Sequence, residues 1–178
     1  MLGGIRSGKS RWAESEIAAS VGPGEPVCYV ATGPETDTDT SWSARIAAHR
    51  ARRPAHWSTV ETQDVATLLR HGIATATVID DMGGWLVAVL HGRGAWTDGG
   101  ASVSGDIDEL LDAVKGFASH LVVVSPEVGL TVVPATASGR RFADELGALN
   151  QRLADICDRV VLIVAGHAMT VKEANDAR

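Results

Sequence analysis

The 178-residue chain has little cysteine, no excess of basic residues and no long hydrophobic run. Its two cysteines, Cys28 and Cys157, stand far apart in apolar surroundings and lack metal-ligand spacing, so we expect two buried thiols. Acidic residues outnumber basic ones and give a formal charge of -6, which excludes the basic footprint of a nucleic-acid binder. We therefore expect no nucleic acid among its partners.

Signals for export or membrane insertion are also missing. The apolar runs fall far short of the roughly 20 residues that a membrane-spanning helix needs. The opening residues MLGGIRSGKS carry no charged region followed by an apolar run and no small-residue cleavage site. We expect no membrane span and a cytoplasmic location.

What the chain does have is an alternation of short apolar runs with helix-like stretches, which predicts one α/β domain over residues 1–178. The runs are almost continuously apolar, as strands of a parallel sheet covered on both faces should be. The expected strands are Pro26–Thr32, Ala76–Asp80, Leu121–Ser125 and Val160–Ala165. The expected helices are Lys9–Ser20, Ser41–Arg52, Thr62–His71, Asp106–Ala118 and Gly139–Cys157.

One central stretch, His91–Gly105, is rich in glycine and serine and has no hydrophobic periodicity. It predicts a long surface loop or a lid.

The strongest motif lies near the N-terminus, where GGIRSGKS fits the Walker A pattern G-x-x-x-x-G-K-[ST]. In such a loop the backbone N–H groups turn toward the β-phosphate, the lysine reaches the β- and γ-oxygens, and the serine hydroxyl holds Mg²⁺. The pattern predicts a P-loop NTPase-like fold, since a helix is expected directly after it. The candidate phosphate-binding residues are Gly3, Gly4, Ile5, Arg6, Ser7, Gly8, Lys9 and Ser10, with Ser10 also a metal ligand.

The strand that should precede this loop is almost missing, because only Met1 and Leu2 come before Gly3. Two explanations are open: an incorrectly assigned start that truncates the first strand, or a sheet with a very short strand at its centre. We favour the first.

A P-loop enzyme also needs a carboxylate at the end of a neighbouring strand to hold the metal through its water shell. Asp80 and Asp81 end the run ATVIDD, and Asp80 is our choice, with Asp81 in reserve. The alternative is a pair of ordinary turn residues.

Taken together, the motifs resemble the bifunctional adenosylcobinamide kinase and adenosylcobinamide-phosphate guanylyltransferase family of cobalamin biosynthesis. The combination of R-I-x-x-H-[KR]-x-x-R-P-x-x-W with E-V-G and L-N-Q is far more specific than Walker A alone. The similarity extends from Gly3 to about Lys172 and rests on the segments Gly3–Glu14, Tyr29–Gly33, Arg45–Glu61, Val78–Asp81, Glu127–Pro134 and Gly139–Gly166.

The resemblance implies two reactions. ATP or GTP would phosphorylate the aminopropanol hydroxyl of adenosylcobinamide, and GTP would then transfer GMP to that phosphate through a GMP-histidine intermediate. By its place in the motif the histidine is His49, which together with Lys9 forms the expected catalytic set. Neutral imidazole is a competent nucleophile toward an α-phosphorus.

The same resemblance implies nucleotide contacts outside the phosphate loop. A carboxylate at Glu61 could accept from the guanine N1 and N2 donors that adenine lacks, although a solvated residue is an equally good interpretation. The expected cofactors are GTP, ATP and Mg²⁺, and the expected assembly is a homo-oligomer, with a trimer as the family's form. The further contacts are Thr32, Gly33, Arg53, Pro54, Ala55 and His56.

Two other functions remain open at this point. One is a small-molecule kinase with another hydroxyl acceptor, in which His49 is inert. The other is a GTP-dependent switch protein, against which the absence of an N-K-x-D motif speaks. Covalent capture of GMP separates the three.

Overall fold

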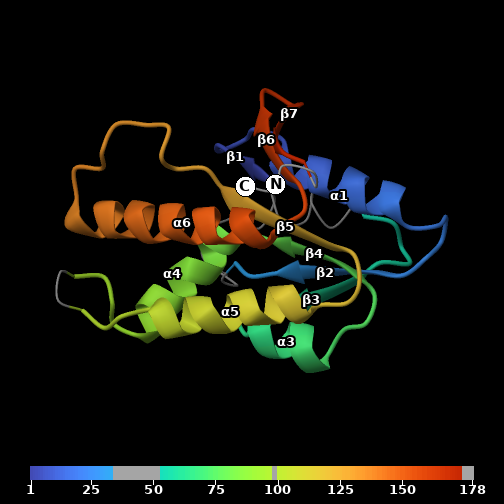
Figure 1. Cartoon of the computed structure of the whole chain (residues 1–178), viewed down its shortest axis with the longest axis horizontal. Helices are drawn as coiled ribbons and strands as arrows, with labels where there is room; N and C mark the ends of the chain where they lie inside the picture. The colour runs from blue at the N-terminus through green and yellow to red at the C-terminus, as the bar shows by residue number, and fades with distance from the viewer. Residues whose placement is uncertain (34–52, 98–99, 174–178) are drawn as a thin grey trace.

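A computed structural model describes residues 1–33, 53–97 and 100–173 of the chain. Its strands form one seven-stranded sheet in the order β3-β2-β4-β5-β1-β6-β7, parallel except for the antiparallel pair β6–β7 (Figure 1). The strands are β1 (Leu2–Gly3), β2 (Val27–Ala31), β3 (Ser58–Glu61), β4 (Ala76–Asp80), β5 (Leu121–Pro126), β6 (Val160–Val164) and β7 (His167–Lys172).

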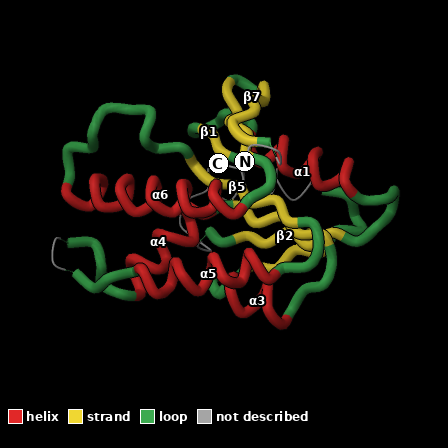
Figure 2. Tube along the Cα trace, viewed as in Figure 1, coloured by secondary structure: helices red, strands yellow, loops and turns green. Residues whose placement is uncertain are grey.

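Helices of the described part cover both faces of this sheet, which confirms the predicted α/β class (Figure 2). In Figure 1, α1 lies above strands β2, β3 and β4, and α3 and α5 lie below them. The helices are α1 (Lys9–Ser20), α3 (Val65–His71), α4 (Met82–Gly92), α5 (Ser104–Gly116) and α6 (Ala137–Ile156). No helix in these ranges has the length and apolar character to cross a membrane.

Successive residues of each strand point to opposite faces of the sheet. On β2, Val27 and Tyr29 pack in a small cluster with Ala13 and Ile17 of α1. Their neighbours on the same strand point the other way, into a larger cluster shared with α3, α4, α5 and α6. This is the period of two that strand geometry imposes. The sheet therefore has a thin α1 face and a thick face under the other helices.

The topological switch point of the sheet lies between β5 and β1, which are hydrogen-bonded neighbours. The helix after β1 packs on the thin face, and the helix after β5 belongs to the thick face. Ligands of open α/β sheets bind outside the carboxyl ends of the strands at such a switch point. The phosphate-binding motif begins there.

The four strands predicted from apolar runs are confirmed with bounds that shift by at most one residue, and the described helices of the prediction are confirmed with bounds that shift by up to three residues. Strands β3 and β7 and helix α4 were not predicted. β3 is a short, mostly exposed edge strand, β7 an exposed edge strand, and α4 is apolar around its whole circumference. None of these shows the periodicity on which the prediction depends.

The expected loop at His91–Gly105 is shorter in the structure, because α4 continues to Gly92 and α5 begins at Ser104. The intervening segment includes residues 98–99, which are outside the described ranges. The predicted helix Ser41–Arg52 also lies outside the described residues.

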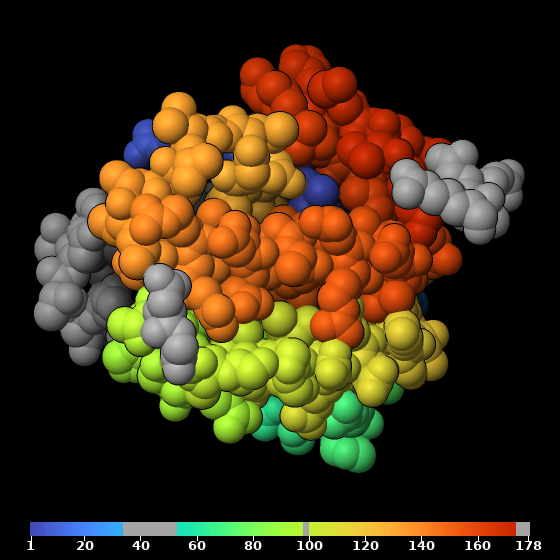
Figure 3. Space-filling model, turned by 60° about the vertical axis from the view of Figure 1, so that its left-hand side comes forward, coloured from blue at the N-terminus to red at the C-terminus, as the bar shows by residue number. Residues whose placement is uncertain are grey.

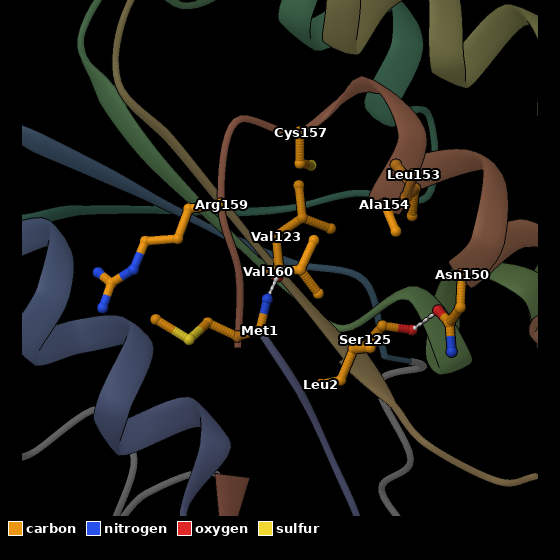
Figure 4. Close-up of a pocket in the computed structure, with 10 residues that line it drawn as sticks. All are labelled: Met1, Leu2, Val123, Ser125, Asn150, Leu153, Ala154, Cys157, Arg159 and Val160. Carbon is orange, nitrogen blue, oxygen red and sulfur yellow. Dashed lines mark hydrogen bonds between the residues drawn. The ribbon is translucent and has the colours of Figure 1, made fainter. Parts of the chain in front are cut away.

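Strand β1 has only two residues and still occupies an interior position of the sheet, between β5 and β6. The Met1 amine donates to the carbonyl of Val123 at 2.8 Å, and the Ser125 N–H donates to the carbonyl of Met1 at 2.9 Å. Burial lowers the pKa of this amine. A pocket lies beyond Met1 (Figure 4), lined by Met1, Leu2, Val123, Ser125, Asn150, Leu153, Ala154, Cys157, Arg159 and Val160.

Candidate nucleotide-binding site

The Walker A residues form a tight loop between β1 and α1. Ser7 N–H donates to the carbonyl of Gly4 at 3.2 Å, and Gly8 adopts a left-handed φ of 96°, which glycine reaches without strain. Gly8 is the N-cap of α1 and brings no side chain to the helix end. The first N–H groups of α1 are thus left to bind an anion, as the Walker A pattern predicts.

The turn between β6 and β7 is hydrogen-bonded to this loop and to the first turn of α1. The Gly166 N–H donates to the carbonyl of Ser7 at 2.9 Å, and the Trp12 indole N–H donates to the carbonyl of Gly166 at the same distance. Within the described part of the chain, the buried Ser7 hydroxyl has no hydrogen-bond partner. An oxygen-rich ligand in the loop would give it one.

Lys9 is the first residue of α1 and only 8% exposed. Its charge attracts the carboxylate of Asp81, but burial and the neighbouring Asp80 carboxylate have the larger effect and raise the pKa of Asp81. Two adjacent carboxylates and one buried ammonium group therefore meet at the carboxyl end of β4. Such a crowded acidic pair is typical of a functional site.

The two aspartates have different hydrogen-bond partners. Asp81 Oδ1 accepts from the Gly84 N–H at 2.8 Å and caps α4 on the thick face. Asp80 follows the parity of Ala76 and Val78, which belong to the α1 cluster, and its Oδ2 accepts a hydrogen bond from the Tyr29 hydroxyl. Asp80 thus shares its face with the helix that begins at the phosphate loop.

The predicted contacts at the end of β2 have distinct environments. Thr32 is 1% exposed; its hydroxyl donates to the carbonyl of Asp81 at 2.6 Å and its N–H to the carbonyl of Asp80 at 3.2 Å. It therefore ties the ends of β2 and β4 together. Gly33 is exposed. A side chain at Gly84 would come within 3.3 Å of the Gly33 Cα, which explains the glycine there.

The segment before β3 reaches the same part of the sheet. The Arg53 guanidinium lies 3.3 Å from the centroid of the Tyr29 ring, and its Nη1 donates to the Thr59 hydroxyl at 2.9 Å. Pro54, Ala55 and His56 form an exposed turn. Arg53 is thus joined to Asp80 through Tyr29.

Glu61 ends β3 opposite Ala31 of β2, at the carboxyl edge of the sheet where the phosphate loop also lies. The proposed nucleophile His49 lies outside the described residues.

The donor set at this edge suits Mg²⁺. The described ranges contain no group of three His, Cys, Asp or Glu side chains that could hold a metal by themselves. Mg²⁺ does not need one, because it keeps several waters and binds one or two carboxylates together with substrate phosphates. The Ser10 hydroxyl and the Asp80 carboxylate are hard oxygen donors of the required kind.

An apolar rim adjoins the phosphate loop. The segment after β5 starts with the Glu127 N–H bound to the carbonyl of Gly3 at 3.1 Å. It then exposes Leu130, Val132 and Val133 by 78%, 87% and 73%. Figure 3 shows this segment, in light orange, standing beside α6 on the surface. We call residues 127–136 the rim loop.

Sequence reasoning missed three residues of this site: Trp12, Tyr29 and Gly166. Their contacts join segments far apart in the sequence, so no local spacing marks them. The one available signal was a phenol, the chain's single tyrosine, inside an otherwise apolar buried strand.

Comparison with known proteins agrees with this geometry. The sequence profile of the family described as "Cobinamide kinase / cobinamide phosphate guanyltransferase" matches residues 1–171. The bifunctional adenosylcobalamin biosynthesis protein CobP of Pseudomonas aeruginosa is 39% identical over 175 residues, covering 97% of this chain and 95% of that protein. The protein CobU of Salmonella typhimurium, with the same description, is 33% identical over 183 residues, covering 97% and 98%. The chain therefore belongs to the cobinamide kinase / cobinamide phosphate guanyltransferase family.

Proposed function

We propose that this enzyme phosphorylates the aminopropanol hydroxyl of adenosylcobinamide with ATP or GTP and then transfers GMP from GTP to the new phosphate. Family membership supports the pair of reactions. The observation that carries the assignment to this site is the buried Lys9 at an open helix N-terminus, facing the acidic end of β4. Membership also disfavours the two other functions considered above.

In the kinase reaction, the substrate hydroxyl oxygen attacks the γ-phosphorus and the bond to the nucleoside diphosphate breaks. Lys9 and the N–H groups of residues 4–10 neutralise charge that spreads over the phosphate oxygens. Mg²⁺, held by Ser10 and Asp80, would supply further positive charge to the phosphates. The main task of the protein here is to position and to stabilise charge.

In the guanylyl transfer, a ring nitrogen of His49 attacks the α-phosphorus of GTP, and pyrophosphate leaves from the phosphate loop. A phosphate oxygen of the phosphorylated cobinamide then attacks the same phosphorus, and the N–P bond to His49 breaks. Two displacements of moderate difficulty replace one difficult step. On this proposal Arg53–His56, Thr32, Gly33 and Glu61 contact the nucleotide.

The corrinoid has to bring its hydroxyl to the phosphate loop while its bulky ring stays outside. The rim loop starts at that loop and exposes Leu130, Val132 and Val133. Exposed apolar patches of this kind mark ligand or partner surfaces. We assign the rim loop to the corrinoid ring. A homo-oligomer, expected as a trimer, is the proposed assembly.

Covalent capture of GMP tests the proposal most directly. The enzyme is incubated with Mg²⁺ and GTP labelled at the α-phosphorus, denatured, and examined for protein-bound label. We expect label on the wild-type protein and none on His49→Ala, which should keep its kinase activity. His71→Ala, which changes an exposed histidine at the end of α3, is the matched control and should be labelled normally. Label on His49→Ala and none on His56→Ala would move the nucleophile to His56.

A further inference from the structure

The only tyrosine of the chain stands at the centre of the site without a role in the chemistry described so far. Tyr29 is 1% exposed, and its hydroxyl donates to Oδ2 of Asp80, the carboxylate assigned above to Mg²⁺. The register of β2 and β4 makes this contact possible, because Ala31 is opposite Asp80 and Tyr29 is opposite Val78. Tyr29 and Asp80 are therefore diagonal neighbours on the same face.

The ring of Tyr29 is itself fixed on two sides. It packs with Ala13 and Ile17 of α1, the helix that begins at the phosphate loop. The guanidinium of Arg53 lies on the ring at 3.3 Å from its centroid, held by the bond to Thr59. A ring held in this way presents its hydroxyl in one direction only.

We propose that Tyr29 is a positioning residue, which fixes the orientation of the Asp80 carboxylate for the metal–nucleotide complex and is itself clamped by Arg53. This inference rests on the proposed function, since it takes Asp80 as the metal carboxylate. Partners that orient a ligating carboxylate change metal affinity by about 10- to 100-fold when they are removed. A phenol is protonated at neutral pH, so the hydroxyl donates to the carboxylate.

The clamp also gives Arg53 a second task. It follows directly on the segment that carries His49, and in the described part of the chain its buried Nε has no hydrogen-bond partner. A phosphate or carboxylate oxygen would satisfy that group. The chain Arg53–Tyr29–Asp80 thus connects the segment of the proposed nucleophile with the metal carboxylate.

The test uses Mn²⁺ as a probe, with affinity for the complex of the enzyme and α,β-methylene GTP, which His49 cannot cleave, measured from the EPR signal of free Mn²⁺. Tyr29→Phe removes the hydroxyl and keeps the ring under Arg53. We expect Mn²⁺ affinity to fall about 10-fold or more, and GTP affinity without metal to stay unchanged. Thr77→Val is the matched control. It removes a different buried hydroxyl, that of Thr77 on β4, which donates to the Thr75 carbonyl and not to Asp80. It should leave Mn²⁺ affinity unchanged.

A double-mutant cycle separates positioning from a general loss of packing. If Tyr29 acts through Asp80, Tyr29→Phe should have no further effect on Mn²⁺ affinity in the Asp80→Asn background. Weakening by Asp80→Asn but not by Tyr29→Phe would overturn the positioning role and leave the proposed function intact. Unchanged affinity in Asp80→Asn would overturn the positioning role together with the assignment of Asp80 to the metal, whereas the two proposed reactions would still be decided by the GMP-capture test.

A spectroscopic measurement reports on the contact itself. Tyrosine labelled with ¹³C at Cζ gives a single NMR signal in this chain. We expect that signal to shift when Mg²⁺ and GTP are added, and to shift in Asp80→Asn without ligand. A signal that responds to neither change would show that the hydroxyl and Asp80 are not coupled, and would overturn the proposal.

Discussion

The two faces of the sheet do different work. The thick face buries a continuous cluster from α3, α4, α5 and α6, including Leu86, Leu110 and Leu149. The thin face has one described helix, and its small cluster gives way to Lys9, Tyr29 and Asp80 toward the carboxyl edge. Successive residues of a strand serve one face each, so the same five-residue strand contributes both to stability and to the site. Substitutions on the two faces should therefore separate loss of activity from loss of stability.

The largest expected effect is on the thin face, at Lys9. Lys9→Ala removes a positive charge from the phosphates in the transition state, a loss of several kcal/mol that should lower both kinase and guanylyl-transfer rates by about a thousandfold. Rates are measured with each substrate pair in turn. Lys115→Ala, which changes an exposed lysine of α5, is the control and should be as active as wild type. Near-normal kinase turnover by Lys9→Ala would place catalysis elsewhere.

The second effect belongs to the thick face. Leu110 is 1% exposed at the centre of its cluster, so Leu110→Ala should lower the free energy of unfolding by about 2–5 kcal/mol. The fraction that remains folded should bind GTP with wild-type affinity. Denaturant unfolding and GTP titration measure the two quantities. Leu130→Ala, in the exposed rim loop, should change stability by less than about 0.5 kcal/mol; an equal loss for both leucines would contradict this view of the core.

These contrasts show what the sequence can predict. Continuous apolar runs identified β2, β4, β5 and β6, because each of these strands carries apolar residues on both of its faces. The same rule could not find β3, an exposed edge strand, or α4, whose apolar circumference hides its period. Lys9 was predicted because the Walker A spacing is local, whereas the bond from Tyr29 to Asp80 depends on the register of two strands fifty residues apart in the chain.

A smaller effect is expected at the edge of the sheet, in base selection. If Glu61 accepts from guanine N1–H and N2–H, Glu61→Gln presents a donor in place of one acceptor. The preference for GTP over ATP should then fall by about 1–3 kcal/mol. Competition between the two triphosphates in the GMP-capture assay measures it. Glu109→Gln, on the thick face and paired with Arg70, is the control. An unchanged preference in Glu61→Gln would assign base recognition to other groups.

The smallest expected effect is on stability, at Asp81, which follows β4 directly at the site. Burial and the Asp80 charge raise the pKa of this carboxyl above its ordinary value of 3.8. A carboxyl with a raised pKa in the folded protein favours folding below pH 3.8 and loses that contribution as the pH rises through the raised value. Asp81→Asn removes the buried charge and keeps an oxygen to cap α4. We expect the free energy of unfolding of this variant to be about 1 kcal/mol higher than that of the wild type at pH 7. Its activity should be lower, because residues of active sites often lower stability in favour of function.

The pH dependence of this gain identifies its cause. The advantage of Asp81→Asn should shrink as the pH falls toward 3.8, since the wild-type carboxyl is then protonated and both side chains are neutral. Asp64→Asn is the matched control, because Asp64 caps α3 in the same way, through the Thr67 N–H, but is exposed. At pH 7 its free energy of unfolding should not exceed that of the wild type. A gain of equal size at both positions would point to capping rather than to the buried charge at the site.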